Sequence, residues 1–436
     1  MMRFVRKINF ILTIFSIIGL AIACTGEELT NLRGNNETQI AESTTEPAWP
    51  GPVVGTNTTP PPAAPSSPTL PEAPTPTFPA SPRLNGERVG IQLVLHQSDE
   101  DWAQSMLQVE RLGIRWIKLQ LAWDYLQASG PEEWGENFKR VELHLQDARR
   151  RGFKILVSLA RAPNWARNTS VEQGPPQDPA TLANFLHFLY SRGIGPLIDA
   201  FEIWNEPNLM REWSGRPING AEYMHYFAAA YEAIRHHSST AIIITAGLSP
   251  VAELPHARDD RNFLREMYAA GLANYRDIAV GIHPYGWANP PDARCCSPGP
   301  ERGWDEHPHF FFLDTLNEYR AIMNFYGHGD VSFWVTEFGW ATWEDLWGEA
   351  PQAWMSYNSL ARQAEYTLRA LQIGEQRADV ALMILWNLNF GAKEINIDQR
   401  DERAAYSLII PAEYIERPVY WKLREAFTGC IVWDCP

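Results

Sequence analysis

Eight short apolar runs, each followed by a stretch of helical periodicity, constrain the fold of this chain more than any other feature. The runs cover residues 89–96, 114–123, 153–160, 197–204, 241–248, 277–285, 331–339 and 380–388. The helical stretches cover residues 99–112, 136–151, 179–192, 220–237, 260–271, 311–326, 353–374 and 418–427. Apolar strands without polar alternation, each followed by an amphipathic helix, are typical of a parallel sheet covered by helices.

Eight such units in about 350 residues predict a closed (β/α)8 barrel, an α/β fold with a single catalytic domain. An open, doubly wound sheet is the alternative, but no glycine-rich dinucleotide-binding turn follows the first apolar run. We expect the barrel domain to cover residues 84–436.

The N-terminus has the pattern of a targeting segment. Three basic residues precede the apolar run 8–23, which ends in the sequence LAIAC. Ordinary secretory cleavage and lipoprotein processing would both cut before Cys24, so residues 1–23 are predicted to be a signal peptide. We favour lipidation of Cys24, which would make this lipid the protein's contact with the membrane. The apolar run is short for a retained membrane span.

Residues 24–83 are predicted to be a disordered linker. Thirteen of the 33 prolines lie between Pro47 and Pro82, among Thr, Ser and Ala. Such a composition cannot build a core and favours an extended tether. The expected location is therefore outside the cytoplasm, on the cell surface or secreted.

The charge balance argues against some partners. A formal net charge of −15 argues against nucleic acid binding, which requires a basic surface. The same charge disfavours a strongly anionic substrate unless a local basic patch is present. The 18 tryptophans are typical either of a large aromatic core or of sugar-stacking platforms. We expect a monomer.

The cysteines suggest a disulfide rather than a metal site. Cys430 and Cys435 are close enough to bridge in an exported protein. Adjacent Cys295 and Cys296 would be strained as a pair, and separate partners or free thiols are equally compatible with the sequence. Other candidate metal ligands follow nearby: Glu306, His307 and His309. Their spacing matches no recognised metal motif, so we expect neither a metal nor a cofactor.

Polar residues stand where four of the apolar runs stop, and those ends meet at one rim of a barrel. The residues are Asn205 and Glu206 after the fourth run, His283 and Tyr285 at the end of the sixth, Glu337 in the seventh and Trp386 in the eighth. Pro207 is expected to end the fourth strand and to leave Glu206 at the lip. Two carboxylates across one mouth suit glycosidic bond cleavage, with one protonated and the other ionised. Either glutamate alone would more often be a solvated loop residue.

The region 89–427 resembles the retaining glycoside hydrolases of clan A. The sequence EIWNEPN at 202–208 is similar to the motif of families 5 and 39, and WVTEFGW at 334–340 fits the nucleophile strand. The resemblance implies that Glu206 is the acid/base and Glu337 the nucleophile.

The same resemblance implies roles for four neighbours of these glutamates. Asn205 would bind the sugar 2-hydroxyl, and the Trp386 ring would form the floor of the −1 subsite. His283 and Tyr285 match the His-x-Tyr of the sixth strand, where the tyrosine contacts the nucleophile. Apart from the resemblance, alternation along the fourth strand predicts that Glu202 is either structural or a supporting neighbour of the catalytic residues.

One position departs from the family pattern. Many family 5 members have an arginine five residues before a tryptophan on the second strand, bonded to the nucleophile, whereas this chain has Lys118 before Trp123. Either Lys118 takes the place of that arginine or the chain belongs to a different branch, and we favour the second alternative. Lysine supplies charge without a bidentate fork.

The leading hypothesis is a retaining β-glycosidase that acts on a polysaccharide or oligosaccharide. A non-catalytic carbohydrate-binding lipoprotein and a transglycosylase that uses the same residues are the alternatives. Further aromatic residues follow the strands and could be sugar platforms, although loop packing is favoured for each: Trp165, Trp213, Trp287, Trp340 and Trp343.

Overall fold

The structure is a computed structural model that describes residues 83–167, 172–296, 307–346, 348–390, 402–410 and 414–430. The predicted signal peptide, Cys24, nearly all of the predicted linker, Glu306 and Cys435 lie outside these residues. The predicted Cys430–Cys435 bridge therefore stays a prediction. Cys295 and Cys296 form a disulfide with one another, the pairing that the sequence disfavoured.

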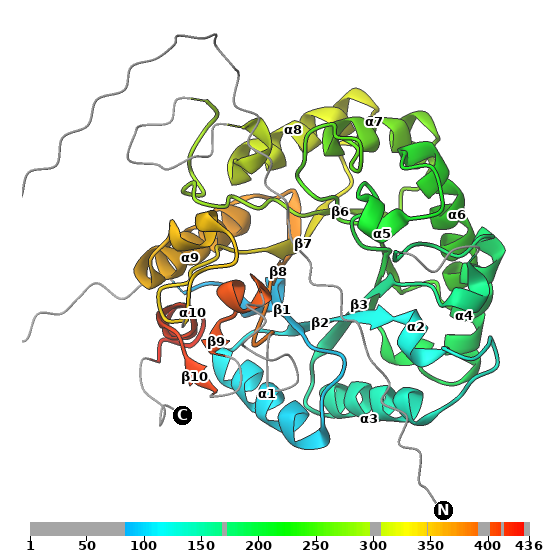
Figure 1. Ribbon diagram of the computed structural model, residues 1–436, viewed down its shortest axis with the longest axis horizontal. Coiled ribbons are helices and arrows are strands. Elements are labelled where there is room, and N and C mark those ends of the chain that lie inside the picture. The colour runs from blue at the N-terminus through cyan, green and yellow to red at the C-terminus, as the bar shows by residue number, and fades with distance from the viewer. Residues whose placement is uncertain are drawn as a thin grey trace, which may run out of the picture. The chain divides into compact units, whose positions relative to one another are not determined.

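Eight parallel strands close into a barrel in chain order, which confirms the predicted (β/α)8 fold (Figure 1). The strands are β1 (Val89–Leu93), β2 (Trp116–Ala122), β3 (Lys154–Ala160), β4 (Ala200–Ile203), β5 (Ile242–Thr245), β6 (Ile278–Ile282), β7 (Phe333–Phe338) and β8 (Val380–Leu385). All eight fall within the apolar runs of the sequence. β8 pairs with β1, so the barrel has no open edge.

Helices surround the barrel and cover the outer faces of its strands (Figure 1). They are α1 (Asp99–Leu112), α3 (Glu136–Arg150), α4 (Pro179–Ser191), α6 (Gly220–His237), α7 (Asp260–Ala269), α8 (Phe312–Phe325), α9 (Leu360–Gln376) and α10 (Pro418–Thr428). The prediction of one continuous helix over 353–374 is wrong at its start. A 3-10 turn η7 (Ala353–Ser356) precedes α9, and the Ser359 side chain caps the start of α9.

Two short helices in the connections that follow strands were not predicted from the sequence. They are α2 (Trp123–Leu126), after β2, and α5 (Met210–Trp213), in the chain that follows β4. A small antiparallel ladder of β9 (Ile409–Ile410) and β10 (Ile415–Glu416) lies outside the barrel sheet. None of the described helices is both long and apolar enough to cross a membrane.

The interior of the barrel changes from apolar to charged along the strands. Its apolar layer consists of Trp116, Leu156, Ala200, Ile244, Ala279, Trp334, Leu382 and Ile384. Two residues further along three of these strands, the buried side chains are Lys118, Glu202 and Thr336, each 0% exposed. Since every second residue of a strand faces the same side, these polar groups lie above the apolar layer, towards the C-terminal ends. The apolar layer supports a charged layer at the barrel mouth.

Candidate active site

The backbone turns sharply after β4 and presents Glu206 at the mouth. Trp204 and Glu206 have positive φ angles of 77° and 40°, a conformation that is uncommon for residues other than glycine. The strand ends at Ile203. The expectation that Pro207 ends the strand is therefore wrong, because the left-handed turn at Trp204 ends it first. The amide of Glu206 donates to the carbonyl of Gly247, past the end of β5, at 3.1 Å. This bond fixes Glu206 against the neighbouring strand.

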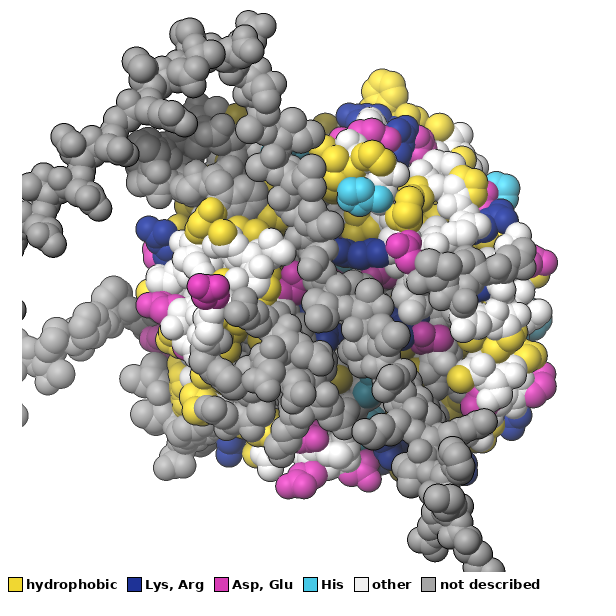
Figure 2. Space-filling view, in the orientation of Figure 1, with side chains coloured by type: hydrophobic (Ala, Val, Ile, Leu, Met, Phe, Trp, Pro, Cys, Tyr) yellow, Lys and Arg dark blue, Asp and Glu magenta, His cyan; other side chains and the backbone are white. Residues whose placement is uncertain are grey.

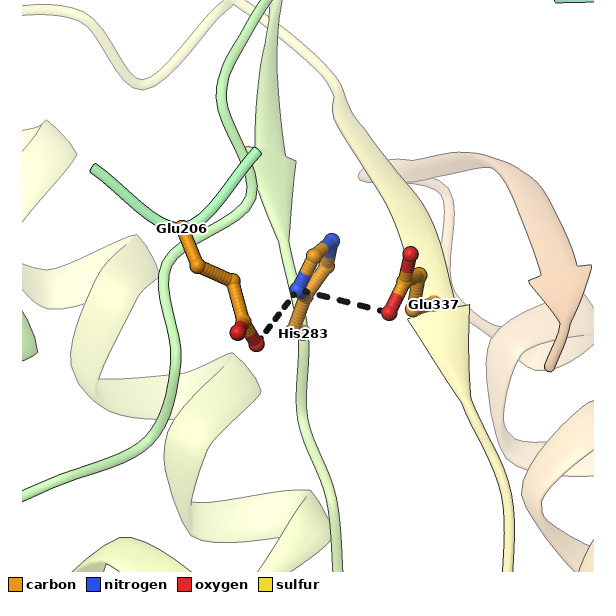
Figure 3. Close-up of side chains that lie close together, drawn as sticks. All are labelled: Glu206, His283 and Glu337. Carbon is orange, nitrogen blue, oxygen red and sulfur yellow. Dashed lines mark hydrogen bonds and ion pairs between the residues drawn. The ribbon is translucent and has the colours of Figure 1, made fainter. Parts of the chain in front are cut away.

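Glu206 and Glu337 face one another across His283 (Figure 3). The Nδ1 atom of His283 lies 3.2 Å from Oε1 of Glu206 and 3.9 Å from Oε2 of Glu337. One carboxylate oxygen of Glu206 and one of Glu337 lie within 4.8 Å of each other. The two carboxyl groups are therefore close, and both side chains are buried.

Two donors hold the Glu337 carboxylate. The Lys118 ammonium lies 3.0 Å from Oε1, and the Tyr285 hydroxyl donates to Oε2 at 3.0 Å. Burial raises the pKa of Tyr285 well above its usual value, and the charge of Glu337 adds to that rise, so the hydroxyl keeps its proton. Lys118 thus contacts the carboxylate that an arginine contacts in many family 5 members. This geometry fits substitution of the arginine, the alternative that the sequence analysis did not favour.

Lys118 and Glu202 form a buried ion pair beneath the two facing carboxylates. The Lys118 Nζ atom lies 2.9 Å from Glu202 and also donates to the carbonyl of Thr336 at 3.1 Å. Its hydrogen-bond acceptors are the Thr336 carbonyl and the Glu337 carboxylate, and its contact with Glu202 is an ion pair. Burial lowers the pKa of Lys118, but the charges of Glu202 and Glu337 outweigh this effect and raise it. Burial raises the pKa of Glu202, and the charge of Lys118 outweighs that effect and holds it far below its usual range.

His283 connects this ion pair to Glu206. Its Nε2 atom lies 3.1 Å from the Thr336 hydroxyl and 3.7 Å from Glu202. Burial alone would lower the pKa of His283, but the charge of Glu337 and the hydrogen bonds to Glu202 and Glu206 raise it to about 9. The imidazole is therefore protonated at neutral pH.

Glu206 has a second cationic partner in Arg211, on α5. The guanidinium Nη2 lies 2.9 Å from Oε2 of Glu206. Burial raises the pKa of Glu206, but the hydrogen bond to His283 and the charge of Arg211 outweigh it and lower the pKa. Because His283 Nδ1 and Glu206 are hydrogen-bonded, the pair holds one proton that either group can carry.

Asn205 and Trp386, the other two predicted binding residues, lie at the same rim. The Oδ1 atom of Asn205 is buried and has no hydrogen-bond partner among the described residues. Trp386 is half-buried, and its ring lies edge-on to Tyr285 at a centroid distance of 5.9 Å. The structure thus brings together all seven residues that the sequence singled out.

Most of the other candidate aromatic platforms are packing residues. Four of them are buried: Trp213, Trp287, Trp340 and Trp343. Trp165 is half-buried, and its indole nitrogen donates to the carbonyl of Gln127 at 2.5 Å.

Two groups of side chains in the described residues have the spacing of metal ligands. One is Glu206, His283 and Glu337, and in this group the protonated imidazole disfavours a cation. The other is Asp259, Asp260 and His309. There the Arg261 guanidinium lies 2.8 Å from both oxygens of Asp260 and already supplies the positive charge.

Sequence reasoning missed two contacts of the site. Arg211 lies in a connection whose conformation depends on tertiary packing, and no sequence spacing marks it. Thr336 precedes Glu337, so strict alternation would place only one of the two at the mouth. A register irregularity between Val335 and Phe338 breaks that alternation and lets both contribute.

Comparisons with known proteins identify the family and the fold. The cellulase family, glycosyl hydrolase family 5, matches residues 83–359. No curated protein sequence matches the chain. A family 39 glycoside hydrolase from the gut symbiont Bacteroides cellulosilyticus WH2 has a similar structure, with a TM-score of 0.58 at 16% identity over 80% of this chain and 66% of that one.

Two further structures show the same fold. The β-glycosidase BGL167 has a TM-score of 0.53 at 14% identity over 82% of this chain and 99% of its own. A glucosidase from Croceicoccus marinus has a TM-score of 0.53 at 12% identity over 80% and 69%. At such identities the likeness establishes the fold alone, whereas the family match spans more than half of the chain. The chain belongs to glycosyl hydrolase family 5 and is a glycoside hydrolase.

Proposed function

We propose that the protein is a retaining β-glycosidase in which Glu337 is the nucleophile and Glu206 the acid/base. The observation that carries this proposal is the approach of the two carboxylates to within 4.8 Å between oxygens. Retaining enzymes keep their carboxyl groups about 5–5.5 Å apart, whereas inverting enzymes need about 6.5–9.5 Å to fit a water molecule. The substrate is a β-linked polysaccharide or oligosaccharide.

In the first step Glu337 attacks the anomeric carbon, and the bond to the leaving oxygen breaks as that oxygen takes a proton from Glu206. Lys118 and Tyr285 orient the attacking carboxylate by donating to its two oxygens. In the second step water attacks the glycosyl-enzyme and gives its proton to Glu206, which restores Glu337 and releases the sugar.

The Glu206–His283 pair is the source of the first proton. In the free protein the imidazolium holds it, and the 3.2 Å contact lets it pass to the carboxylate. As the leaving oxygen gains negative charge it becomes more basic, so it takes the proton from Glu206, and Glu206 takes one from the imidazolium. We assign Asn205 to the sugar 2-hydroxyl and Trp386 to the face of the sugar ring.

Stereochemistry tests this proposal. Proton NMR during hydrolysis of an aryl β-glycoside should show the β anomer as the first sugar product, followed by mutarotation. An α anomer at the first time points would establish inversion and reject Glu337 as a nucleophile.

Product analysis distinguishes hydrolysis from the transglycosylase alternative. A transglycosylase would transfer the glycosyl group to a second sugar even at low acceptor concentration, and longer products would accumulate. A non-catalytic binding role is disfavoured because both carboxylates and their charged partners are in place.

We also propose that the protein is exported and anchored through a lipid on Cys24. The support is the basic and apolar N-terminal segment that ends in LAIAC, followed by the proline-rich residues 24–83. Mass spectrometry of the N-terminal peptide from the membrane fraction should show a diacylglyceryl cysteine. An unmodified N-terminus at Cys24 would reject the lipid anchor and keep the proposal of export.

A further inference from the structure

One side of the barrel mouth carries three arginines in a protein whose net charge is −15. Arg161 directly follows β3, Arg167 follows the short turn η2 (Asn164–Ala166), and Arg211 lies on α5. We call these three residues the arginine side. Lys and Arg side chains are visible around α5 in the space-filling view (Figure 2). The backbone of Arg161 has a positive φ of 61°, a conformation that is costly outside glycine and often found at functional sites.

The arginine side begins next to the proton donor. Arg211 contacts Glu206 at 2.9 Å, and Arg167 donates to the carbonyl of Ser214 at 3.3 Å. Arg211 and Ser214 stand about one helical turn apart, about 5 Å along the chain axis. A sugar unit adjacent to the cleaved bond would therefore lie within reach of Arg167.

Arg167 lacks a carboxylate partner among the described residues. The Ser214 carbonyl is its one hydrogen-bond acceptor there, and its Nε atom is buried without an acceptor. Burial lowers the pKa of Arg167, but a guanidinium stays charged in proteins. A partly buried cation with an unmet donor is stabilised when an anion binds.

Carboxylates form ion pairs with two of the three guanidinium groups of the arginine side. Arg161 pairs with Asp124 at 2.8 Å, and Arg211 pairs with Glu206. Burial raises the pKa of Glu212 to about 8, so it is protonated at neutral pH. Burial and the charge of Arg161 lower the pKa of His96 to about 4, so it is uncharged.

Two of the three guanidinium groups are thus engaged in ion pairs, with Asp124 and Glu206, whereas the charge of Glu172 acts on Arg167 without an ion pair among the described residues. Among the described residues Arg167 is therefore the member of the arginine side without an ion pair, and Glu206 no longer balances the charge of Arg211 when Glu206 carries the proton that it donates. A guanidinium that contacts a carbonyl but no carboxylate can still pair with an incoming anion.

We propose that the arginine side binds a negatively charged sugar unit next to the cleaved bond, so that the natural substrate is an acidic polysaccharide or oligosaccharide. The charged unit is a uronate or a sulfated sugar, since a guanidinium pairs with either group through two hydrogen bonds. This inference rests on the proposed glycosidase function and adds the substrate class to it.

Matched substrates test the charge requirement. Uronate-containing oligosaccharides are compared with the same oligosaccharides after chemical reduction of their carboxyl groups, and sulfated ones with their desulfated forms. One charge-assisted contact supports a preference in kcat/KM of about tenfold or more for one of the acidic forms, and added salt should weaken it. Equal kcat/KM on acidic and neutral forms would overturn the inference.

A neutral aryl β-glycoside separates this inference from the proposed function. Turnover of the aryl substrate without any preference for acidic oligosaccharides rejects the acidic-substrate inference and keeps the glycosidase. If neither the aryl glycoside nor any oligosaccharide is cleaved, the glycosidase function and the acidic-substrate inference are both rejected. Where an acidic oligosaccharide is not cleaved, it should still inhibit aryl turnover more strongly than its neutral form, and equal inhibition also rejects the inference.

Variants locate the charge requirement. Arg167→Gln should reduce the preference for acidic over neutral substrates about tenfold. Arg276→Gln is the matched control, because Arg276 precedes β6 at the opposite end of the barrel and pairs with Asp330. A preference that survives Arg167→Gln and also Arg161→Gln would contradict the assignment of these residues.

Discussion

Lys118 supplies a positive charge to Glu337 from within the barrel, where a lysine is costly. Its side chain is fully buried, and three oxygen-bearing groups contact its ammonium group: the carboxylates of Glu202 and Glu337 and the carbonyl of Thr336. A lysine cannot form the bidentate contact of an arginine, so its direction depends on the acceptors around it. Glu202 is therefore a positioning residue that aims Lys118 at Glu337.

Removal of Lys118 should cost both stability and turnover. Lys118→Met removes the ammonium group that contacts both buried carboxylates and should lower the free energy of unfolding by about 3–5 kcal/mol. The double variant Lys118→Met/Glu202→Gln should regain much of that stability, because it also removes one of the two carboxylate charges. Turnover should remain low in both, since Glu337 lacks its cation. Urea denaturation and steady-state kinetics measure the two effects, and recovery of turnover in the double variant would contradict the role of Lys118.

The two glutamates should differ in how their removal affects each step. Glu337→Gln should abolish turnover of every substrate, because no nucleophile remains. Glu206→Gln should still release the aryl group from an activated glycoside in a burst, since that leaving group needs little protonation, and should then stall. Added azide should rescue Glu206→Gln and give a β-glycosyl azide, which NMR identifies. A β-azide from Glu337→Gln instead would reverse the assignment.

At the scale of elements, the ends of β5, β6 and β7 fit together tightly around His283. Gly247, just past β5, donates its amide to Glu202 at 3.1 Å and accepts the amide of Glu206. A Cβ atom at Gly247 would lie 2.2 Å from the His283 ring and 2.8 Å from the Thr336 hydroxyl. Only glycine leaves room for the imidazole between the two carboxylates.

Gly247→Ala should therefore displace His283 and lower kcat by about 100-fold or more, because misplaced proton-transfer groups lose most of their contribution. Substrates with poor leaving groups should lose more than activated aryl glycosides. Gly130→Ala is the matched control, since a Cβ atom there meets nothing within 4 Å. Equal kcat in the Gly247→Ala and Gly130→Ala variants would contradict the packing argument.

Apolar patterning predicted the barrel elements well and the connections poorly. The eight strands follow from short apolar runs, and the carboxyl ends of parallel strands meet, so Glu206, His283 and Glu337 could be expected at one rim. The helix α5 could not be predicted, because its conformation depends on tertiary contacts. Trp213 packs edge-on against Trp204 at 5.6 Å, and the Trp204 indole donates to the carbonyl of Glu212. The contact of Arg211 with Glu206 follows from that packing.

At the scale of the whole chain, the proline-rich segment should be dispensable for catalysis. Residues 24–83 lack the apolar residues for a core and precede the first barrel strand. A shortened chain that begins at Arg83 should keep the thermal transition and the turnover of the chain that begins at Cys24. A large loss of either would show that the segment contributes to the catalytic domain.

The charged layer of the barrel should make stability fall as the solution becomes alkaline. The pKa of His283 is raised to about 9 in the folded chain, against about 6.5 when unfolded, so its contribution to stability is fully present below about pH 6.5 and disappears as the pH rises through 9. Glu212 acts in the same direction, because a carboxyl group with a folded pKa of about 8 retains a proton that the unfolded chain has lost.

Urea denaturation from pH 6 to 9.5 measures this fall in the free energy of unfolding, which reaches at most about 1.4 kcal/mol per pH unit for each proton. Glu212→Gln removes the carboxyl contribution and should leave a decline that continues to about pH 9. That remaining decline belongs to the imidazolium that lies between Glu206 and Glu337. A free energy of unfolding that stays constant from pH 6.5 to 9 in Glu212→Gln would show that His283 is neutral, and the proton for the leaving group would then have to come from Glu206 alone.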